Sequence, residues 1–179
     1  MRTRQALKQS LAELPALAAE KRRALTALDS VVKAIDRELA RLNGNHPPTA
    51  PLVTRLKTIS GVGPLVATLL AALLQRFAFR HADALIAYVG LDPRPDESGQ
   101  HLGRRRLSKR GHPEWRRLLV AAAMSAARSR AWRDYVAHQR TKALPATAIH
   151  VILARKMLRV ALALHKNHQP FIAPQTQTA

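Results

Sequence analysis

Cysteine is absent from the 179 residues, which excludes disulfides, thiolate zinc sites and a cysteine nucleophile. Aromatic residues make up only 4% of the chain, too few to predict a stacking platform for single-stranded nucleic acid. The longest apolar stretch, residues 65–74, is about half as long as a membrane span. No apolar run follows the first eight residues, so we expect no secretory signal and a cytoplasmic, nucleoid-associated protein with no membrane partner.

Acidic residues are also scarce, with 11 Asp and Glu against 30 Lys and Arg, for a formal charge of +19. This imbalance creates a positive field that favours a polyanion. We expect nucleic acid as the partner, with duplex DNA as the better target; an anionic membrane surface is the main alternative. Hydrophobic residues make up 47% of the chain, enough to build a core, so the chain is not a disordered basic tail.

An apolar seam runs through the first 43 residues and predicts a coiled-coil helix that joins protomers into a homodimer or higher oligomer. Pro15 is expected at the start of the long helix, and residues 43–48, NGNHPP, end it, so residues 1–50 form a dimerisation helix and linker. The alternative is a helix that packs against its own domain. The seam repeats in steps of four and three, broken only at Lys21, and comprises Leu7, Leu11, Leu14, Ala18, Leu25, Leu28, Val32, Ile35, Leu39 and Leu42.

Residues 51–170 are predicted to form a second, nearly all-helical domain, so the fold class is mainly α. Helices are expected before residue 60, from Pro64, over residues 82–89, from Pro113 through residue 140, and from Pro145, because proline favours the first helical turn. The polar residues 171–179 are predicted to form a disordered tail. Trp115 and Trp132 are expected in the core.

The segment LKTISGVGPLVA, residues 56–67, matches a helix-hairpin-helix pattern. Gly61 and Gly63 allow a tight turn and close approach of another backbone, and the N–H groups of the next helix can hold a phosphate. Such an element binds DNA without reading bases. An ordinary connection between two helices is the alternative.

Residues 91–111, LDPRPDESGQHLGRRRLSKRG, are predicted to form an exposed loop or short ribbon. The segment presents the Ser98 hydroxyl beside a dense group of cations that suits a phosphodiester backbone. These DNA-binding candidates are Arg94, Arg104, Arg105, Arg106, Lys109 and Arg110. Five later arginines either extend this basic face or lie on a solvated helix face: Arg116, Arg117, Arg128, Arg130 and Arg133.

Ser98 is either a nucleophile or a turn residue, and Ser-Gly is a common loop dipeptide, so sequence alone favours the turn. A serine that attacks phosphorus needs a group that takes its proton and charges that stabilise the phosphoryl oxygens. The arginines supply the second need, whereas no neighbour clearly supplies the first, although Asp96, Glu97 and His101 are near. Asp92, Asp96 and Glu97 make a weak metal site, so we predict no metal ligands in this chain.

The strings ISGVGPLVATLLAALL, FRHADALIAYVGLDPRPDESGQHLGRRRLSKRGHPEWRRLLVAAAMSA and ARKMLRVALALHK carry a family resemblance. They resemble the C-terminal domain of the DEDD-type insertion-sequence transposases, the insertion sequence one-hundred-ten family of bridge-RNA-guided recombinases. The resemblance covers residues 56–166 with the motifs in the family's order. The combination of GVGP, AYVGLDPR, SG and SKRG is far more specific than any one of them.

The resemblance implies that Ser98 is the nucleophile that joins covalently to DNA and that residues 108–111, SKRG, lie near the DNA. It also implies a coiled coil that pairs protomers and a guide RNA as a possible partner. The family's N-terminal RuvC-like domain, with four metal-binding carboxylates, has no counterpart in this sequence. Mg²⁺ is therefore expected only with that domain, supplied separately, and none within this chain.

Two functions follow from these observations. The first is the C-terminal half of a transposase, which binds DNA and supplies a serine nucleophile for strand cleavage and transfer, inactive as this chain alone. The second is a non-enzymatic nucleic-acid-binding protein that uses the glycine hairpin and the basic loop, with Ser98 as a turn residue. A membrane-surface helix protein is a third possibility, and it predicts lipid binding without steeply salt-dependent DNA affinity.

Overall fold

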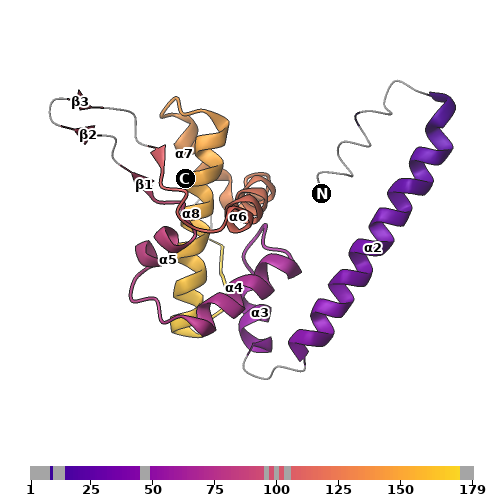
Figure 1. Cartoon of the computed structure of the whole chain (residues 1–179), viewed down its shortest axis with the longest axis horizontal. Helices are drawn as coiled ribbons and strands as arrows, with labels where there is room; N and C mark the ends of the chain where they lie inside the picture. Colours follow the sequence, from indigo (N-terminus) through magenta and orange to yellow (C-terminus); the bar gives the residue numbers. More distant parts are fainter. Residues whose placement is uncertain are drawn as a thin grey trace, which may run out of the picture. The chain divides into compact units, whose positions relative to one another are not determined.

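The computed structural model describes residues 9, 15–44, 49–94, 97–98, 101–102 and 106–173. The chain divides into two compact units, residues 1–45 and residues 46–179. Helices account for most of the described residues, and the short strands all lie between residues 93 and 107 (Figure 1). The prediction of a mainly α fold is confirmed.

The first unit is built around one long helix. A 3-10 turn, η1 (Pro15–Leu17), leads directly into α2 (Ala18–Gly44). The helical segment therefore starts at Pro15 and ends within residues 43–48, as the sequence predicts. Every residue of α2 is described and none is buried. Its large exposed apolar side chains include Val31, Val32, Ile35 and Leu42. The helix is confirmed, and its pairing as a coiled coil stays a prediction.

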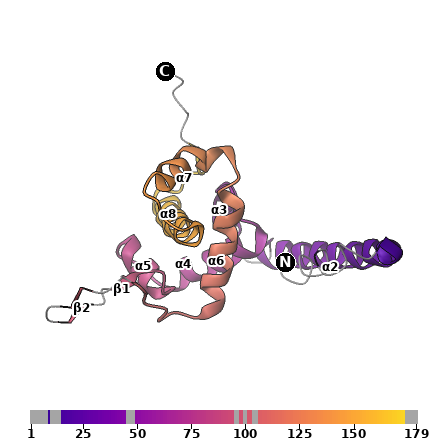
Figure 2. The same cartoon turned by 90° about the horizontal axis from the view of Figure 1, so that it is seen from above.

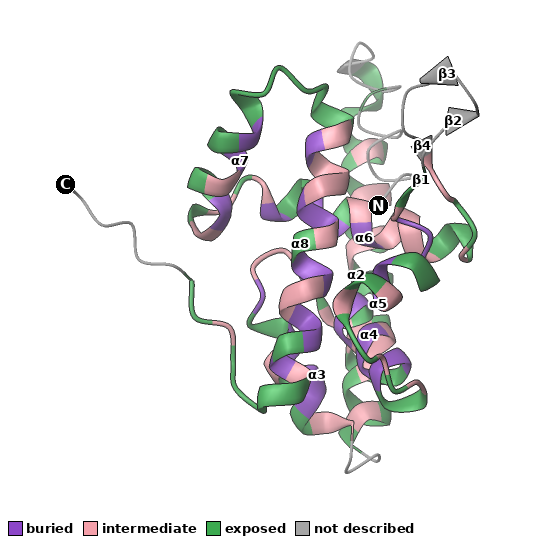
Figure 3. Cartoon of the chain, turned by 90° about the vertical axis from the view of Figure 1, so that its left-hand side faces the viewer, coloured by how far each residue is buried: buried purple, intermediate pink, exposed green. Residues whose placement is uncertain are grey.

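The second unit packs its helices around α8 (Ala146–Asn167), which contacts α3 (Ala50–Lys57), α4 (Pro64–Arg76), α5 (Ala82–Tyr88), α6 (Pro113–Ala126) and α7 (Arg133–Arg140). Figure 2 shows α8 nearly end-on among the other helices of this unit. Buried residues follow the length of α8 (Figure 3), and Leu153 and Leu158 are fully enclosed. The central position of α8 follows from its sequence, because small and aliphatic residues recur along it at helical spacing. Among the described helices, none is both long and apolar enough to cross a membrane.

Prolines mark the helix starts as predicted. Pro64 and Pro113 are the first residues of α4 and α6, and Pro145 directly precedes α8. Proline suits these positions because the first-turn N–H groups have no partner within the helix.

The helix predicted from Pro113 through residue 140 is wrong in extent, because α6 ends at Ala126. The hydroxyl of Ser129 donates to the Ala126 carbonyl oxygen at 2.7 Å, and a 3-10 turn, η2 (Arg130–Trp132), separates α6 from α7. The break turns Trp132 into the core, where it is 4% exposed and its indole N–H donates to the Ser60 carbonyl oxygen at 3.1 Å. Trp132 is thus a core residue as predicted, and Trp115 is half-buried against the core.

The basic segment forms a short antiparallel ribbon, in agreement with the predicted loop or ribbon. At its base β1 (Pro93–Arg94) pairs with β4 (Arg106–Leu107), and farther out β2 (Glu97–Ser98) pairs with β3 (His101–Leu102). The pairing is nested, because the inner strands β2 and β3 pair with each other and the outer strands β1 and β4 pair with each other. The sequence of the segment therefore folds back on itself between α5 and α6.

The predicted tail begins at a residue that is held in place. The Phe171 ring stacks on Trp132 with centroids 5.4 Å apart and planes at 11°, and its N–H donates to the Thr58 hydroxyl at 2.7 Å. Residues 174–179 lie outside the described part of the chain.

Candidate nucleic-acid interface

The base of the ribbon starts from the end of α5. Gly90 adopts a left-handed φ of 71°, its N–H donates to the Ala87 carbonyl oxygen at 2.9 Å, and the Leu91 N–H donates to Ile86 at 3.0 Å. This pair of bonds is the Schellman arrangement, which needs glycine at the left-handed position. Leu91 is buried just beyond it, so the strand that follows leaves the helix in a defined direction.

The SKRG segment, residues 108–111, packs against the GLDPR segment, residues 90–94, at the base of the ribbon. The N–H of Ser108 donates to the Asp92 carbonyl oxygen at 3.0 Å, the Ser108 hydroxyl hydrogen-bonds to the Asp92 carboxylate, and the Lys109 N–H donates to Gly90 at 3.3 Å. A Cβ on Gly111 would collide with the carbonyl oxygen of Tyr88. The GLDPR and SKRG segments are therefore complementary halves of one clamp that holds both ends of the ribbon.

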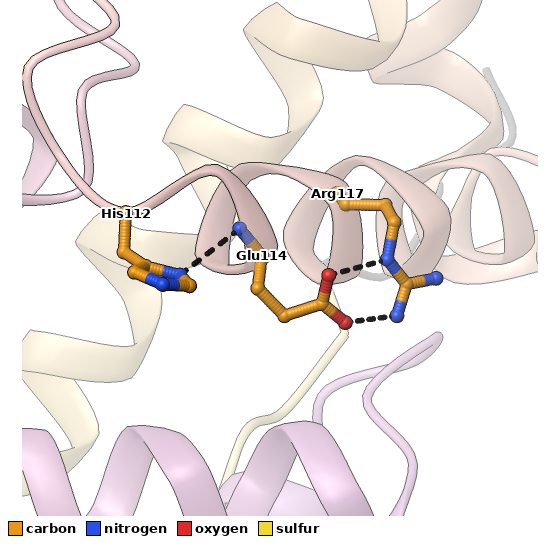
Figure 4. A network of polar contacts seen from close by, with 3 residues as sticks. All are labelled: His112, Glu114 and Arg117. Atoms are coloured by element: carbon orange, nitrogen blue, oxygen red, sulfur yellow. Dashed lines mark hydrogen bonds and ion pairs between the residues drawn. The ribbon is translucent and has the colours of Figure 1, made fainter.

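Two of the five later arginines take part in internal contacts. The Arg116 guanidinium donates to the carbonyl oxygens of Lys109, at 3.2 Å, and Gly111, so this half-buried side chain supports the clamp instead of extending a basic face. Arg117 binds the Glu114 carboxylate through Nε at 2.8 Å and through a second guanidinium nitrogen (Figure 4). That hydrogen-bonded ion pair raises the pKa of Arg117. In the same network His112 caps α6, since its Nδ1 accepts from the Glu114 N–H at 3.3 Å.

The clamp leaves several predicted cations exposed. Arg94, Lys109 and Arg110 all have exposed side chains around the ribbon base. Arg104, Arg105 and Asp96 lie outside the described residues, and for Ser98, Glu97, His101 and Arg106 only the backbone is described. The backbone places Ser98 directly opposite His101 in the β2–β3 pair. Within the described residues, no group of three His, Asp or Glu side chains is placed to hold a metal ion.

The two glycines of the predicted hairpin have different roles. Gly61 has a left-handed φ of 95°, and a Cβ there would lie 2.5 Å from the Ala126 Cβ and 2.7 Å from the Ala122 carbonyl oxygen. Gly61 therefore brings the hairpin against α6 within the protein. Gly63, by contrast, is the N-cap of α4 and has open space where a Cβ would be. Only Gly63 leaves the backbone open to an outside partner.

The hairpin is joined to an arginine-rich turn. The Trp132–Ser60 hydrogen bond and the Gly61–Ala126 contact hold the turn after α6 beside the start of α4. The exposed arginines of this turn are Arg128, Arg130 and Arg133. Sequence reasoning included them only as a possible basic face, because their position beside the hairpin depends on contacts between residues more than 60 positions apart.

Helix α6 connects these two cationic regions. Its first turn follows the ribbon clamp at residues 108–111, and its last residue, Ala126, lies against the hairpin. The 14 residues of α6 span about 20 Å. The arrangement presents exposed cations at both ends of one rigid rod, a spacing suited to two separate points on a nucleic-acid backbone.

Comparison with known proteins shows a similarity to a transposase family over part of the chain. Residues 53–137 match the family described as Transposase IS116/IS110/IS902. An "Insertion element IS116 uncharacterized 44.8 kDa protein" from Streptomyces clavuligerus is 29% identical over 159 residues, which cover 87% of this chain and 39% of that relative. The chain thus spans about two fifths of the length of the relative. The matched segment contains the hairpin, the ribbon, its clamp and the arginine turn.

Proposed function

We propose that the chain is the DNA-binding, C-terminal part of an insertion-sequence transposase, with Ser98 as its nucleophile. The observation that supports this most directly is the clamp between the GLDPR and SKRG segments, which lies inside the family match and holds the basic ribbon that carries Ser98. A clamp of this kind fixes the base of the ribbon through contacts within the protein, and we propose that the ribbon presents Ser98 to DNA.

DNA binding follows from the charge on the two ends of α6. Arg94, Lys109 and Arg110 at the ribbon base would hold phosphates at one point, and the turn after α6 would hold phosphates at a second. The open backbone at Gly63 adds the first-turn N–H groups of α4, which are suited to a phosphate oxygen. Contacts of this kind position the protein on the backbone without reading sequence.

In the proposed reaction the Ser98 oxygen attacks the phosphorus of a phosphodiester. A serine–phosphate bond forms, the bond from phosphorus to one strand oxygen breaks, and that oxygen leaves as a hydroxyl after gaining a proton. His101 is the cross-strand partner of Ser98 in the backbone register, and we propose that its imidazole takes the serine proton. The neighbouring arginines would stabilise negative charge on the phosphoryl oxygens.

Further partners belong to the same proposal. Mg²⁺ would be held by a RuvC-like domain that is not among the described residues, and a guide RNA would specify the target. The exposed apolar seam of α2 would pair two protomers, because burying side chains such as Val32 and Ile35 stabilises a coiled coil.

The test of the serine is a covalent adduct. The chain, together with a RuvC-like domain from its relatives, is mixed with labelled insertion-sequence ends and run on a denaturing gel. We expect a slow DNA band with the unaltered chain and no such band with Ser98→Ala, while salt-sensitive DNA binding is unchanged. Ser125→Ala, at an exposed position on α6, is the matched control and should retain the adduct. An adduct that persists in Ser98→Ala would remove the serine assignment.

A non-enzymatic nucleic-acid-binding role is the second candidate. It is favoured by the sequence, because the Ser98-Gly99 pair is a common loop dipeptide, where a serine is found for reasons of backbone alone. This function predicts tight, salt-dependent binding and no adduct under any condition.

A further inference from the structure

Three of the protein's few aromatic side chains form a cluster at the end of α5. Tyr88, at the end of α5, is 44% exposed, although its ring contacts two phenylalanines. Ring centroids lie 5.1 Å away for Phe77 and 5.7 Å away for Phe79. An exposed ring that is already fixed by its neighbours loses little freedom when a flat ligand stacks on it.

Tyr88 borders an open pocket of about 390 Å³ between the end of α5 and the start of α6. This volume is within the range of small-ligand sites. The pocket is lined by Ala87, Tyr88, Arg110, Gly111, His112 and Trp115. Two aromatic residues thus come from two different helices, and the two cationic or titratable side chains, Arg110 and His112, are exposed.

The backbone clamp creates the pocket. A Cβ on Gly111 would collide with the carbonyl oxygen of Tyr88, so glycine at this position allows the segment before α6 to lie beside the end of α5. The Arg116 guanidinium also donates hydrogen bonds to the Lys109 and Gly111 carbonyl oxygens, which fixes the segment before α6. The pocket is therefore preformed by rigid elements.

We propose that this pocket binds one unstacked nucleobase of a nucleic-acid strand. The base would stack on Tyr88 and Trp115, and the adjoining phosphate would be held by Arg110 and His112. Aromatic walls suit the flat face of any base, and the Arg110 guanidinium and an imidazole N–H of His112 suit its phosphate. This inference deepens the proposed nucleic-acid binding and rests on it. The pocket lies where the ribbon joins the helices. The nucleobase held there would therefore belong to a nucleic-acid strand that is unpaired close to the proposed cleavage point.

The test compares two single-stranded ligands of equal length, oligothymidylate and an abasic deoxyribose-phosphate oligomer. With the unaltered chain we expect tighter binding of oligothymidylate. Tyr88→Ala should weaken that complex about tenfold and leave the abasic complex unchanged, because only base stacking is lost. Tyr88→Phe keeps the ring and should restore the preference. Met124→Ala, which removes an exposed apolar side chain on α6, is the control and should alter neither affinity.

A second variant makes the test independent of the fold around Tyr88. Arg110→Ala should lower the affinity for both ligands by a similar factor, because both carry phosphates. The inference is overturned if the unaltered chain binds both ligands equally, or if Tyr88→Ala weakens both to the same extent. Failure to bind either ligand or duplex DNA would instead overturn the proposed function. Quenching of 2-aminopurine placed in the oligothymidylate gives a direct signal of stacking, which Tyr88→Ala should abolish.

Discussion

Ser108 donates to Asp92 twice, with its N–H 3.0 Å from the Asp92 carbonyl oxygen and its hydroxyl bonded to the Asp92 carboxylate. The two residues are 16 positions apart and belong to two separate motifs. Asp92, which the sequence suggested weakly as a metal ligand, therefore has a structural partner within the protein. Its carboxylate is engaged in closing the ribbon clamp.

Loss of this pair should loosen the ribbon. We expect Ser108→Ala to lower the free energy of unfolding by about 1–3 kcal/mol, since a half-buried carboxylate loses a hydrogen-bond donor. Asp92→Ala should act in the same way, and the double variant should cost less than the sum, as measured by denaturant unfolding. Asp83→Ala is the control, because its surface ion pair with Arg159 is worth at most about 1 kcal/mol. Strictly additive effects would mean that the two side chains do not interact.

Alanine should destabilise the fold far more at Gly61 than at Gly63. Gly61→Ala introduces a Cβ at a left-handed φ and against the α6 backbone, so we expect a loss of several kcal/mol in unfolding free energy, or failure to fold. Gly63→Ala meets open space at an ordinary φ of −83°, so it should change stability by less than about 1 kcal/mol, because the lower entropy of unfolded alanine offsets its poorer capping of α4. Equal destabilisation of both variants would show that the hairpin does not pack on α6 in this way.

Local signals in the sequence predicted much of the helical framework. Pro64 and Pro113 indicated the starts of α4 and α6, and Gly44 ended α2, because these residues act on the backbone next to them. The end of α6 at Ala126 was missed. Helical periodicity continues past it, and the break depends on Trp132 reaching Ser60, 72 positions earlier in the chain.

The sequence predicted which residues belong to the candidate site, but it did not predict how they are arranged in space. The basic segment around Ser98 was evident from its residues, and so was the turn chemistry of the Gly61 hairpin. The pairing of Asp92 with Ser108, and the meeting of Tyr88 and Trp115 at one pocket, depend on long-range packing. No spacing rule within one helix or strand brings such residues together, so a single sequence does not reveal them.

The arginine turn should contribute measurably to DNA affinity. Replacing Arg128, Arg130 and Arg133 together by alanine should weaken duplex binding and lower the slope of log affinity against log salt by about 0.9 for each phosphate that the protein no longer neutralises. The slope is measured by fluorescence anisotropy over a salt series. Arg117→Ala is the matched control, since that guanidinium is already paired with Glu114 and a change at this position should alter the slope little. An unchanged slope in the triple variant would place the DNA elsewhere.

His165 should make the second unit less stable in mild acid. Its Nδ1 is buried and has no hydrogen-bond partner among the described residues. Burial lowers the pKa of His165, and the positive charges of His168, Arg55 and Lys166 lower it further. The unfolded chain, where histidine has a pKa of about 6.5, therefore takes up a proton that the folded state resists. Stability is then full above that unfolded pKa and falls as the pH drops below it.

The measurement is the midpoint of thermal unfolding between about pH 7 and about pH 5. His165→Gln cannot take up the proton, so its midpoint should fall less over this range than that of the unaltered chain. His138→Gln, at an exposed position on α7, is the control and should retain the full acid sensitivity. If His165→Gln and the unaltered chain lose stability in parallel, the acid sensitivity arises from another group, and the buried imidazole is not its source.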